Sequence, residues 1–121
     1  MIEAVCHCGA VRIAVPAAPE QVTDCNCSIC RRLGGLWAYY PATQVTITGL
    51  DATETYVRHD GPSMGYLALH HCRTCGCTTH WSSLDPATDR MGVNARLMDP
   101  EVLAQARVRH FNGADDASFR D

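Results

Sequence analysis

Clustered cysteines constrain this chain more than any other feature. Seven of its eight cysteines fall into three short groups, Cys6-x-Cys8-Gly9, Cys25-x-Cys27-x-x-Cys30 and Cys72-x-x-Cys75-Gly76. Where thiols stay reduced, such dense cysteines usually bind metal rather than pair as disulfides. The first residues run into Cys6 with no room for a charged segment followed by an apolar one, so we predict no signal peptide and a cytoplasmic location. The clusters therefore indicate metal sites.

The charge and the length narrow the class of protein further. The 121 residues are enough for one domain with a modest core, which we expect over about residues 5–112, followed by a polar and frayed tail over 113–121. No stretch reaches the roughly 20 apolar residues of a membrane span. The formal net charge of −3 argues against non-specific binding to nucleic acid, which needs a basic face. We therefore expect a single domain without a nucleic-acid or membrane partner.

Short alternating or β-branched runs between turn residues predict a mainly β fold. In the clearest run, Val11, Ile13 and Val15 alternate with Arg12 and Ala14. Further strands are predicted at 36–40, 45–48, 53–57, 65–71, 78–81, 91–96 and 108–111. Only residues 99–106 have a helical pattern, because Asp99 can cap the helix and Pro100 suits its first position. The prediction is a β domain with one short helix.

The first and third cysteine groups are predicted to form one closed metal site. Each offers two thiolates and ends in a glycine, which permits a left-handed backbone whose amides point at the sulfurs. Cys6, Cys8, Cys72 and Cys75 together would complete a four-thiolate zinc site. An alternative completes a four-thiolate set with Cys77, although Cys77 can equally be an inert core cysteine.

The middle group differs because it supplies three sulfurs and is followed by Arg31 rather than glycine. Three protein ligands with one exchangeable position are the pattern of a catalytic zinc, which would make Cys25, Cys27 and Cys30 catalytic ligands. The alternative is that these three are free buried cysteines. The sequence thus predicts two zinc ions per chain, the second more labile than the first.

Taken together, the three motifs resemble those of the glutathione-dependent formaldehyde-activating enzyme family, which includes centromere protein V. The matching segments are Cys6 to Arg12, Cys25 to Arg32 and Cys72 to Gly76, in the family's order. The resemblance implies a β-tent of stacked antiparallel sheets, a structural zinc on the closed set and a labile zinc on the middle set. It also implies condensation of glutathione with formaldehyde, an activity classed with carbon–sulfur lyases. The chain departs from many members at His71, where they have phenylalanine, and at Cys77, often threonine or serine.

Several other side chains are candidates for roles beside the middle set. Arg31 and Arg32 directly follow Cys30, so they could offset its charge or bind a glutathione carboxylate, or simply lie in solvent. The proton-transfer candidates are His70, His71 and His80, and the pocket candidates are Trp37, Tyr39 and Tyr40. Two non-catalytic functions remain as alternatives: a zinc module that binds a partner protein, and a zinc or thiol sensor. The sequence does not indicate an oligomeric state.

Overall fold

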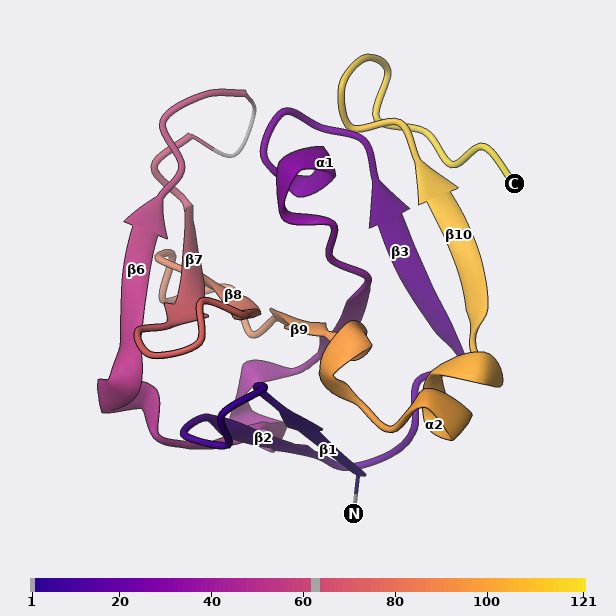
Figure 1. The fold of residues 1–121 in the computed structure, drawn as a ribbon. Coiled ribbons are helices and arrows are strands. Elements are labelled where there is room, and N and C mark those ends of the chain that lie inside the picture. Colours follow the sequence, from indigo (N-terminus) through magenta and orange to yellow (C-terminus); the bar gives the residue numbers. More distant parts are fainter. Residues whose placement is uncertain (1, 62–63) are drawn as a thin grey trace.

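The seven-stranded sheet that dominates the fold is shown in Figure 1, a computed structural model describing residues 2–61 and 64–121. Its strand order is β10-β3-β4-β9-β8-β7-β6, and every pair is antiparallel except β10 with β3, which is parallel. The strands are β3 (Gln21–Cys25), β4 (Trp37–Tyr40), β6 (Thr53–Val57), β7 (Leu67–Cys72), β8 (Thr78–Ser83), β9 (Met91–Asn94) and β10 (Arg107–Phe111). The predicted mainly β fold is confirmed, with one parallel pair where the resemblance implies antiparallel sheets.

A smaller sheet completes the β structure. It has the order β1-β2-β5, with strands β1 (Ile2–Val5), β2 (Arg12–Val15) and β5 (Thr46–Thr48). In β2, Ile13 and Val15 are buried and Arg12 is exposed, which confirms the predicted alternation. They share the main core with Val22, Ala38 and Val93 of the seven-stranded sheet. The core of the protein therefore lies between the two sheets.

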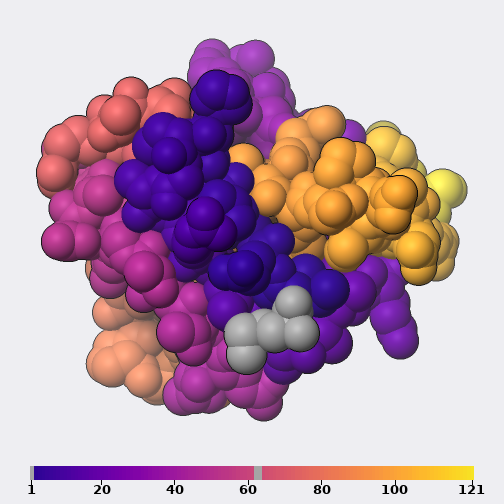
Figure 2. Space-filling model, turned by 60° about the horizontal axis from the view of Figure 1, so that its bottom comes forward, coloured from indigo at the N-terminus to yellow at the C-terminus, as the bar shows by residue number. Residues whose placement is uncertain are grey.

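Helical segments are short and connect the strands. They are α1 (Cys30–Leu33), α2 (Pro100–Ala104) and the 3₁₀ turns η1 (Ala42–Gln44), η2 (Leu50–Ala52) and η3 (Ala95–Leu97). The segment α2 confirms the predicted helix: Pro100 is its first residue and the Asp99 carboxylate accepts a hydrogen bond from the Glu101 amide. Figure 2 shows this orange part of the chain against the indigo N-terminal strands, where Ala4 pairs with Met98.

Three predictions of local structure were wrong or incomplete. Residues 99–106 are not the only helical segment, because α1 forms one turn whose first residue is Cys30; its single turn and lack of a side-chain cap leave no sequence signal. The predicted strand at 91–96 ends at Asn94, whose side chain accepts from the Arg96 amide and starts η3. Strands β1 and β3 were not predicted.

The C-terminal segment is folded, which corrects the prediction of a frayed tail. It turns back along β10, so that Phe111 pairs with Phe119 and their ring centroids lie 5.0 Å apart. Its end is held by Asp121, whose carboxylate accepts from Arg109 at 2.8 Å. Two aromatic rings and an ion pair compensate for the polar composition of the segment.

Candidate metal centres

The first cysteine set joins the N-terminus to the β7–β8 turn. Cys6 and Cys8 follow β1, whereas Cys72 ends β7 and Cys75 lies in the turn after it. Their four sulfurs lie within 4.8 Å of one another, with Cys6–Cys8 at 3.7 Å and Cys8–Cys72 at 3.6 Å. A tetrahedron of zinc–sulfur bonds of about 2.3 Å has edges of about 3.8 Å, so the observed spacing fits zinc.

Glycine and backbone amides shape this first set. Gly9 and Gly76 have φ of 83° and 79°, in the left-handed region where a side chain is strained. The amide of Val11 donates to the Cys6 sulfur at 3.3 Å. Cys77 is not among the four sulfurs; it is half-buried against the main core, and its carbonyl accepts from the Cys72 amide at 2.9 Å. The knuckle geometry thus follows the expectation from the two Cys-Gly patterns.

The second set collects three cysteines from one short segment. Cys25 ends β3, Cys27 lies in the following loop and Cys30 begins α1, and their sulfurs lie within 4.8 Å of one another. The amide of Cys30 donates to the Cys27 sulfur at 3.4 Å, and the Trp37 indole donates to the Cys30 sulfur at 3.3 Å. Within the described part of the chain, no fourth cysteine, histidine or carboxylate joins them. The donor set fits a zinc ion with one position left for another ligand.

A buried arginine against the second set was not predicted. The Arg58 side chain is 7 % exposed, and its guanidinium donates to the Cys27 sulfur at 3.6 Å. Its Nε also donates to the Asp60 carboxylate at 3.1 Å, and Ser28 donates to the other oxygen of that carboxylate. These hydrogen bonds, from Ser28 first and then Arg58, lower the pKa of Asp60. No sequence signal marks Arg58, because it is far along the chain from Cys27.

The two arginines that the sequence places beside the second set lie at the surface. Arg31 and Arg32 are both exposed, and Arg32 donates to the Ser28 carbonyl at 2.6 Å. Neither is among the described residues that line the cavity next to the cysteines. The charge-offsetting contact that the sequence suggested for them is made by Arg58 instead.

A cavity of about 570 Å³ opens directly onto the second set, and all three of its cysteines line it. Figure 1 shows the β3–β10 pair and the β6–β7 pair on opposite sides of the molecule, with α1 between them. Residues from β3, β4, β7, β8 and β10 all reach the cavity, because the seven-stranded sheet curves around it. The volume falls within the range of small-molecule sites.

Aromatic side chains form much of the cavity wall. Trp37 and Tyr39 line it from one face of β4, whereas Tyr40 faces the core and donates to the Ala17 carbonyl at 2.9 Å. Successive side chains of a strand face opposite ways. Two of the three predicted pocket residues therefore line the cavity, and the third faces the core. The remaining aromatic wall residues, which the sequence analysis did not select, are Trp81, Phe111 and Phe119.

Glycines make room for the second set and the indole beside it. A Cβ atom at Gly113 would lie 2.7 Å from the Cys25 sulfur, closer than real Cβ contacts. A Cβ at Gly92 would lie 2.0 Å from Trp81 Nε1, so the Trp81 ring lies directly over this strand. Both positions therefore need glycine for a close approach.

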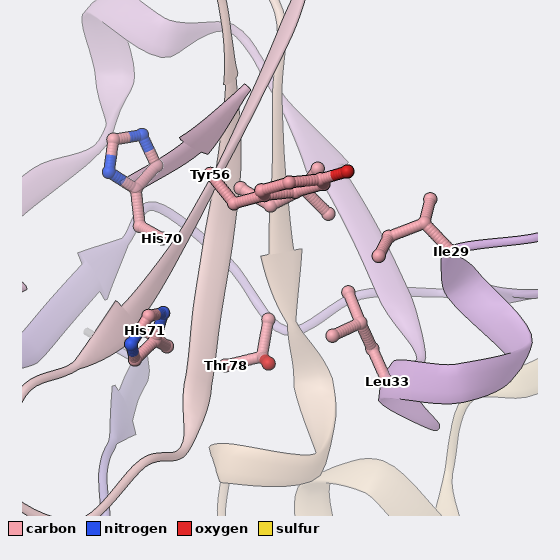
Figure 3. Close-up of a pocket in the computed structure, with 7 residues that line it drawn as sticks. Ile29, Leu33, Tyr56, His70, His71 and Thr78 are labelled. Carbon is pink, nitrogen blue, oxygen red and sulfur yellow. The ribbon is translucent and has the colours of Figure 1, made fainter. Parts of the chain in front are cut away.

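The predicted proton-transfer histidines lie away from the larger cavity. His70 and His71 line a smaller cavity of about 280 Å³, in which Ile29 and Leu33 face Tyr56 and Thr78 (Figure 3). His80 lines neither cavity and is 1 % exposed.

The imidazoles of His70 and His80 stack with their centroids 4.1 Å apart. Burial lowers the pKa of His70, and burial followed by the charge of His70 lowers the pKa of His80 to about 3. Hydroxyl groups surround the pair: Ser82 lies 2.8 Å and Thr55 3.1 Å from the His70 nitrogens, and Thr79 lies 2.9 Å from His80 Nδ1. Near neutral pH both imidazoles are therefore neutral and are held by hydroxyl groups. This arrangement favours a structural role for the two histidines.

Comparison with known proteins agrees with this geometry. A crystal structure of a Rhodobacter sphaeroides protein, a structural genomics target, is similar with a TM-score of 0.67 and 26 % identity, over 88 % of this chain and 98 % of that chain. No helix in the described residues is long and apolar enough to cross a membrane. Residues 1–114 match the family described as glutathione-dependent formaldehyde-activating enzyme. The chain, with two cysteine sets that can hold metal, therefore belongs to the glutathione-dependent formaldehyde-activating enzyme family.

Proposed function

We propose that this protein is a zinc enzyme that adds a thiol such as glutathione to a small aldehyde such as formaldehyde. The observation that carries the proposal is the three-cysteine set, which lies in the wall of a cavity of ligand size and lacks a fourth side-chain ligand in the described chain. The other set has four sulfurs and is proposed to be structural. This assignment gives the two zinc ions different functions.

The proposed reaction is an addition in which no atom is lost. The substrate sulfur forms a bond to the carbonyl carbon, the π pair of the carbonyl moves to its oxygen, and the thiol proton ends on that oxygen. Zinc at Cys25, Cys27 and Cys30 would supply an open coordination position that lowers the pKa of the incoming thiol. The cavity walls hold the two reactants together, and proximity is the main source of rate in such an addition.

The chain's own residues fix the geometry of the three sulfurs. Trp37 donates to the Cys30 sulfur and Arg58 to the Cys27 sulfur, so two of the three thiolates are held from outside the set. Such outer contacts orient metal ligands and tune them. Eight reduced cysteines also suit a compartment that keeps thiols reduced, and we propose the cytoplasm.

Metal analysis is the first test of this function. Purified protein should hold two zinc ions per chain, and mild chelation should remove about one of them while the circular dichroism spectrum persists, because the closed set keeps four protein ligands. Loss of both ions together with the fold would contradict the assignment of two different sites. Two ions that both resist chelation and thiols would favour the alternative of a non-catalytic zinc module.

Product formation is the second test. With ¹³C-formaldehyde and glutathione, zinc-loaded protein should accelerate appearance of the S-hydroxymethyl carbon signal above the uncatalysed rate, and Cys27→Ser should not. Replacing both Arg31 and Arg32 by glutamine should leave the rate with glutathione close to that of the wild type, because neither residue lines the cavity. Equal rates with and without the protein would contradict the proposed activity.

A further inference from the structure

The larger cavity has more apolar wall than a sulfur atom and a one-carbon aldehyde can cover. Five aromatic rings line it, from β4, β8, β10 and the C-terminal segment. Tyr39 and Trp81 lie with their ring centroids 6.0 Å apart, and Phe111 and Phe119 with theirs 5.0 Å apart. Its volume of about 570 Å³ is far larger than the roughly 30 Å³ that one water molecule occupies. Covering this wall is favourable only when the ligand has an apolar part that packs against it.

Apart from the three cysteines, the charged groups in the wall have one sign. Arg58 and Arg90 are the charged residues among the described lining residues, and none of that lining is acidic. Arg58 is held by Asp60 and by the Cys27 sulfur. The Arg90 guanidinium lies 4.1 Å from the centroid of the Tyr39 ring and forms no ion pair in the described part of the chain. Arg90, which is exposed, therefore lacks an anionic protein partner among the described residues.

The C-terminal segment contributes a wall that lies beyond the family match. Ala117 and Phe119 line the cavity, whereas the match to the family ends at residue 114. Phe119 is held in place by a tilted ring contact with Phe111 and by Arg109, whose guanidinium lies 3.8 Å from the centroid of its ring. The shape of this end of the cavity is thus set by residues of this chain outside the matched region.

From the aromatic wall and the unpaired guanidinium, we infer that the thiol substrate is an apolar thiol acid, whose carboxylate binds Arg90 and whose apolar body packs against Tyr39, Trp81 and Phe119. This inference rests on the proposed function, because it assigns the body of the thiol that the second cysteine set would accept. Arginine binds a carboxylate through paired hydrogen bonds, and the contact with the Tyr39 ring already orients this guanidinium. Glutathione fits less well, because its ammonium group meets no carboxylate in the described lining.

Binding of a sulfur-free analogue tests the inference independently of the chemistry. Both tryptophans of the chain, Trp37 and Trp81, line the cavity, so intrinsic fluorescence excited at 295 nm reports on its occupancy. The probe is 3-phenylpropanoate, and its neutral partner is 3-phenylpropan-1-ol. We expect the carboxylate to bind about tenfold more tightly than the alcohol, the ratio of one charge-assisted contact. Equal affinities would overturn the assignment of Arg90.

Two variants and a matched control locate the contacts. Arg90→Gln should weaken 3-phenylpropanoate by about tenfold and leave the alcohol unchanged. Phe119→Leu should weaken both probes, because it shrinks the apolar wall without removing it. Arg12→Gln removes another exposed arginine, which lies in β2 and lines neither cavity, and it should change neither affinity. An equal effect of Arg90→Gln on both probes would overturn the inference, and circular dichroism checks that each variant is folded.

A thiol series separates failure of this inference from failure of the proposed function. On zinc-loaded protein with ¹³C-formaldehyde, 2-mercapto-3-phenylpropanoate should give a higher kcat/KM than 2-phenylethanethiol or glutathione, and Arg90→Gln should remove its advantage. If glutathione reacts best and Arg90→Gln is without effect, the inference fails and the function stands. If the reaction of no thiol is accelerated but 3-phenylpropanoate binds through Arg90, the proposed function fails. The cavity is then a binding site for apolar acids, and the assignment of a thiol substrate is wrong.

Discussion

Arg58 balances the charge of the second cysteine set. Three thiolates around one divalent ion leave a net charge of −1. The Arg58 guanidinium lies 3.6 Å from the Cys27 sulfur, and the Arg58 side chain is only 7 % exposed. Charges attract more strongly in a poorly solvated site than in water. Asp60 offsets part of this effect, because it takes another hydrogen bond from the same guanidinium. The contact should favour the ionised, metal-holding form of the set.

Replacing Arg58 by methionine should make the second site lose zinc faster. We expect the rate of zinc release to a colorimetric chelator to rise by roughly tenfold, the size of one lost charge-assisted hydrogen bond. Arg31→Gln is the matched comparison, because it removes a charge next to Cys30 in the sequence from an exposed side chain. If Arg31→Gln has the larger effect, the role assigned to Arg58 is wrong.

His80 should make the stability of the folded protein fall with acidity. Its folded pKa of about 3 lies below the ordinary value of 6.5, so the unfolded state binds a proton first. The contribution is complete above about pH 6.5 and is lost progressively as the pH falls towards 3. Between pH 7 and 5.5, wild type should lose about 1 kcal/mol more unfolding free energy than His80→Gln.

Urea titrations of both proteins at pH 7.0, 6.25 and 5.5 measure this difference. Subtracting the variant removes the part of the slope that comes from protonation of the cysteines, which both proteins share. Parallel pH profiles for the two proteins would show that burial does not lower the pKa of His80 in the folded state.

Among the elements, α2 depends on its cap. It spans only five residues, Pro100–Ala104, so it has few hydrogen bonds of its own. The Asp99 carboxylate accepts from the Glu101 amide at 2.8 Å, and this bond satisfies a donor that the first turn leaves free. Asp99→Ala should lower the unfolding free energy by about 1 kcal/mol. Asp99→Asn, which keeps an accepting oxygen, should stay close to wild type in the same denaturant titration.

The strand β4 explains how one element serves two sites. Its alternate residues Trp37 and Tyr39 reach the cavity, and Ala38 and Tyr40 reach the main core. A single strand therefore couples packing between the sheets to the wall of the candidate active site. The alternation itself is visible in the sequence, but the face that each residue occupies depends on the neighbouring strands.

For the whole molecule, the closed cysteine set would act as a long-range cross-link when it holds zinc. Cys8 and Cys72 are 64 residues apart in the chain, and their sulfurs lie 3.6 Å apart. Since metal binding at such a site is folding free energy, Cys75→Ser should lower the melting temperature more than Cys27→Ser. Cys77→Ser is the control, because its sulfur lies outside the set. A lower melting temperature for Cys27→Ser would reverse the assignment of the two sites.

The sequence by itself determined the parts that depend on local spacing. Cys25, Cys27 and Cys30 are close enough in the chain for one short segment to bring their sulfurs together, and Gly9 and Gly76 provide the left-handed turns of the knuckles. Alternation in β2 and the cap of α2 are likewise local. Interactions within a few residues are set by backbone geometry, so a pattern can reveal them.

Only the tertiary structure decided which distant residues surround the second set. Arg58, Arg90 and Phe119 come from a loop after β6, the connection to β9 and the C-terminal segment, and each carries a side chain that is ordinary in its own stretch of sequence. The curvature of the seven-stranded sheet brings them to one cavity, and it also turns the polar C-terminal residues into a folded wall. Contacts across a sheet depend on strand order and register, which the sum of all packing fixes and which no short motif encodes.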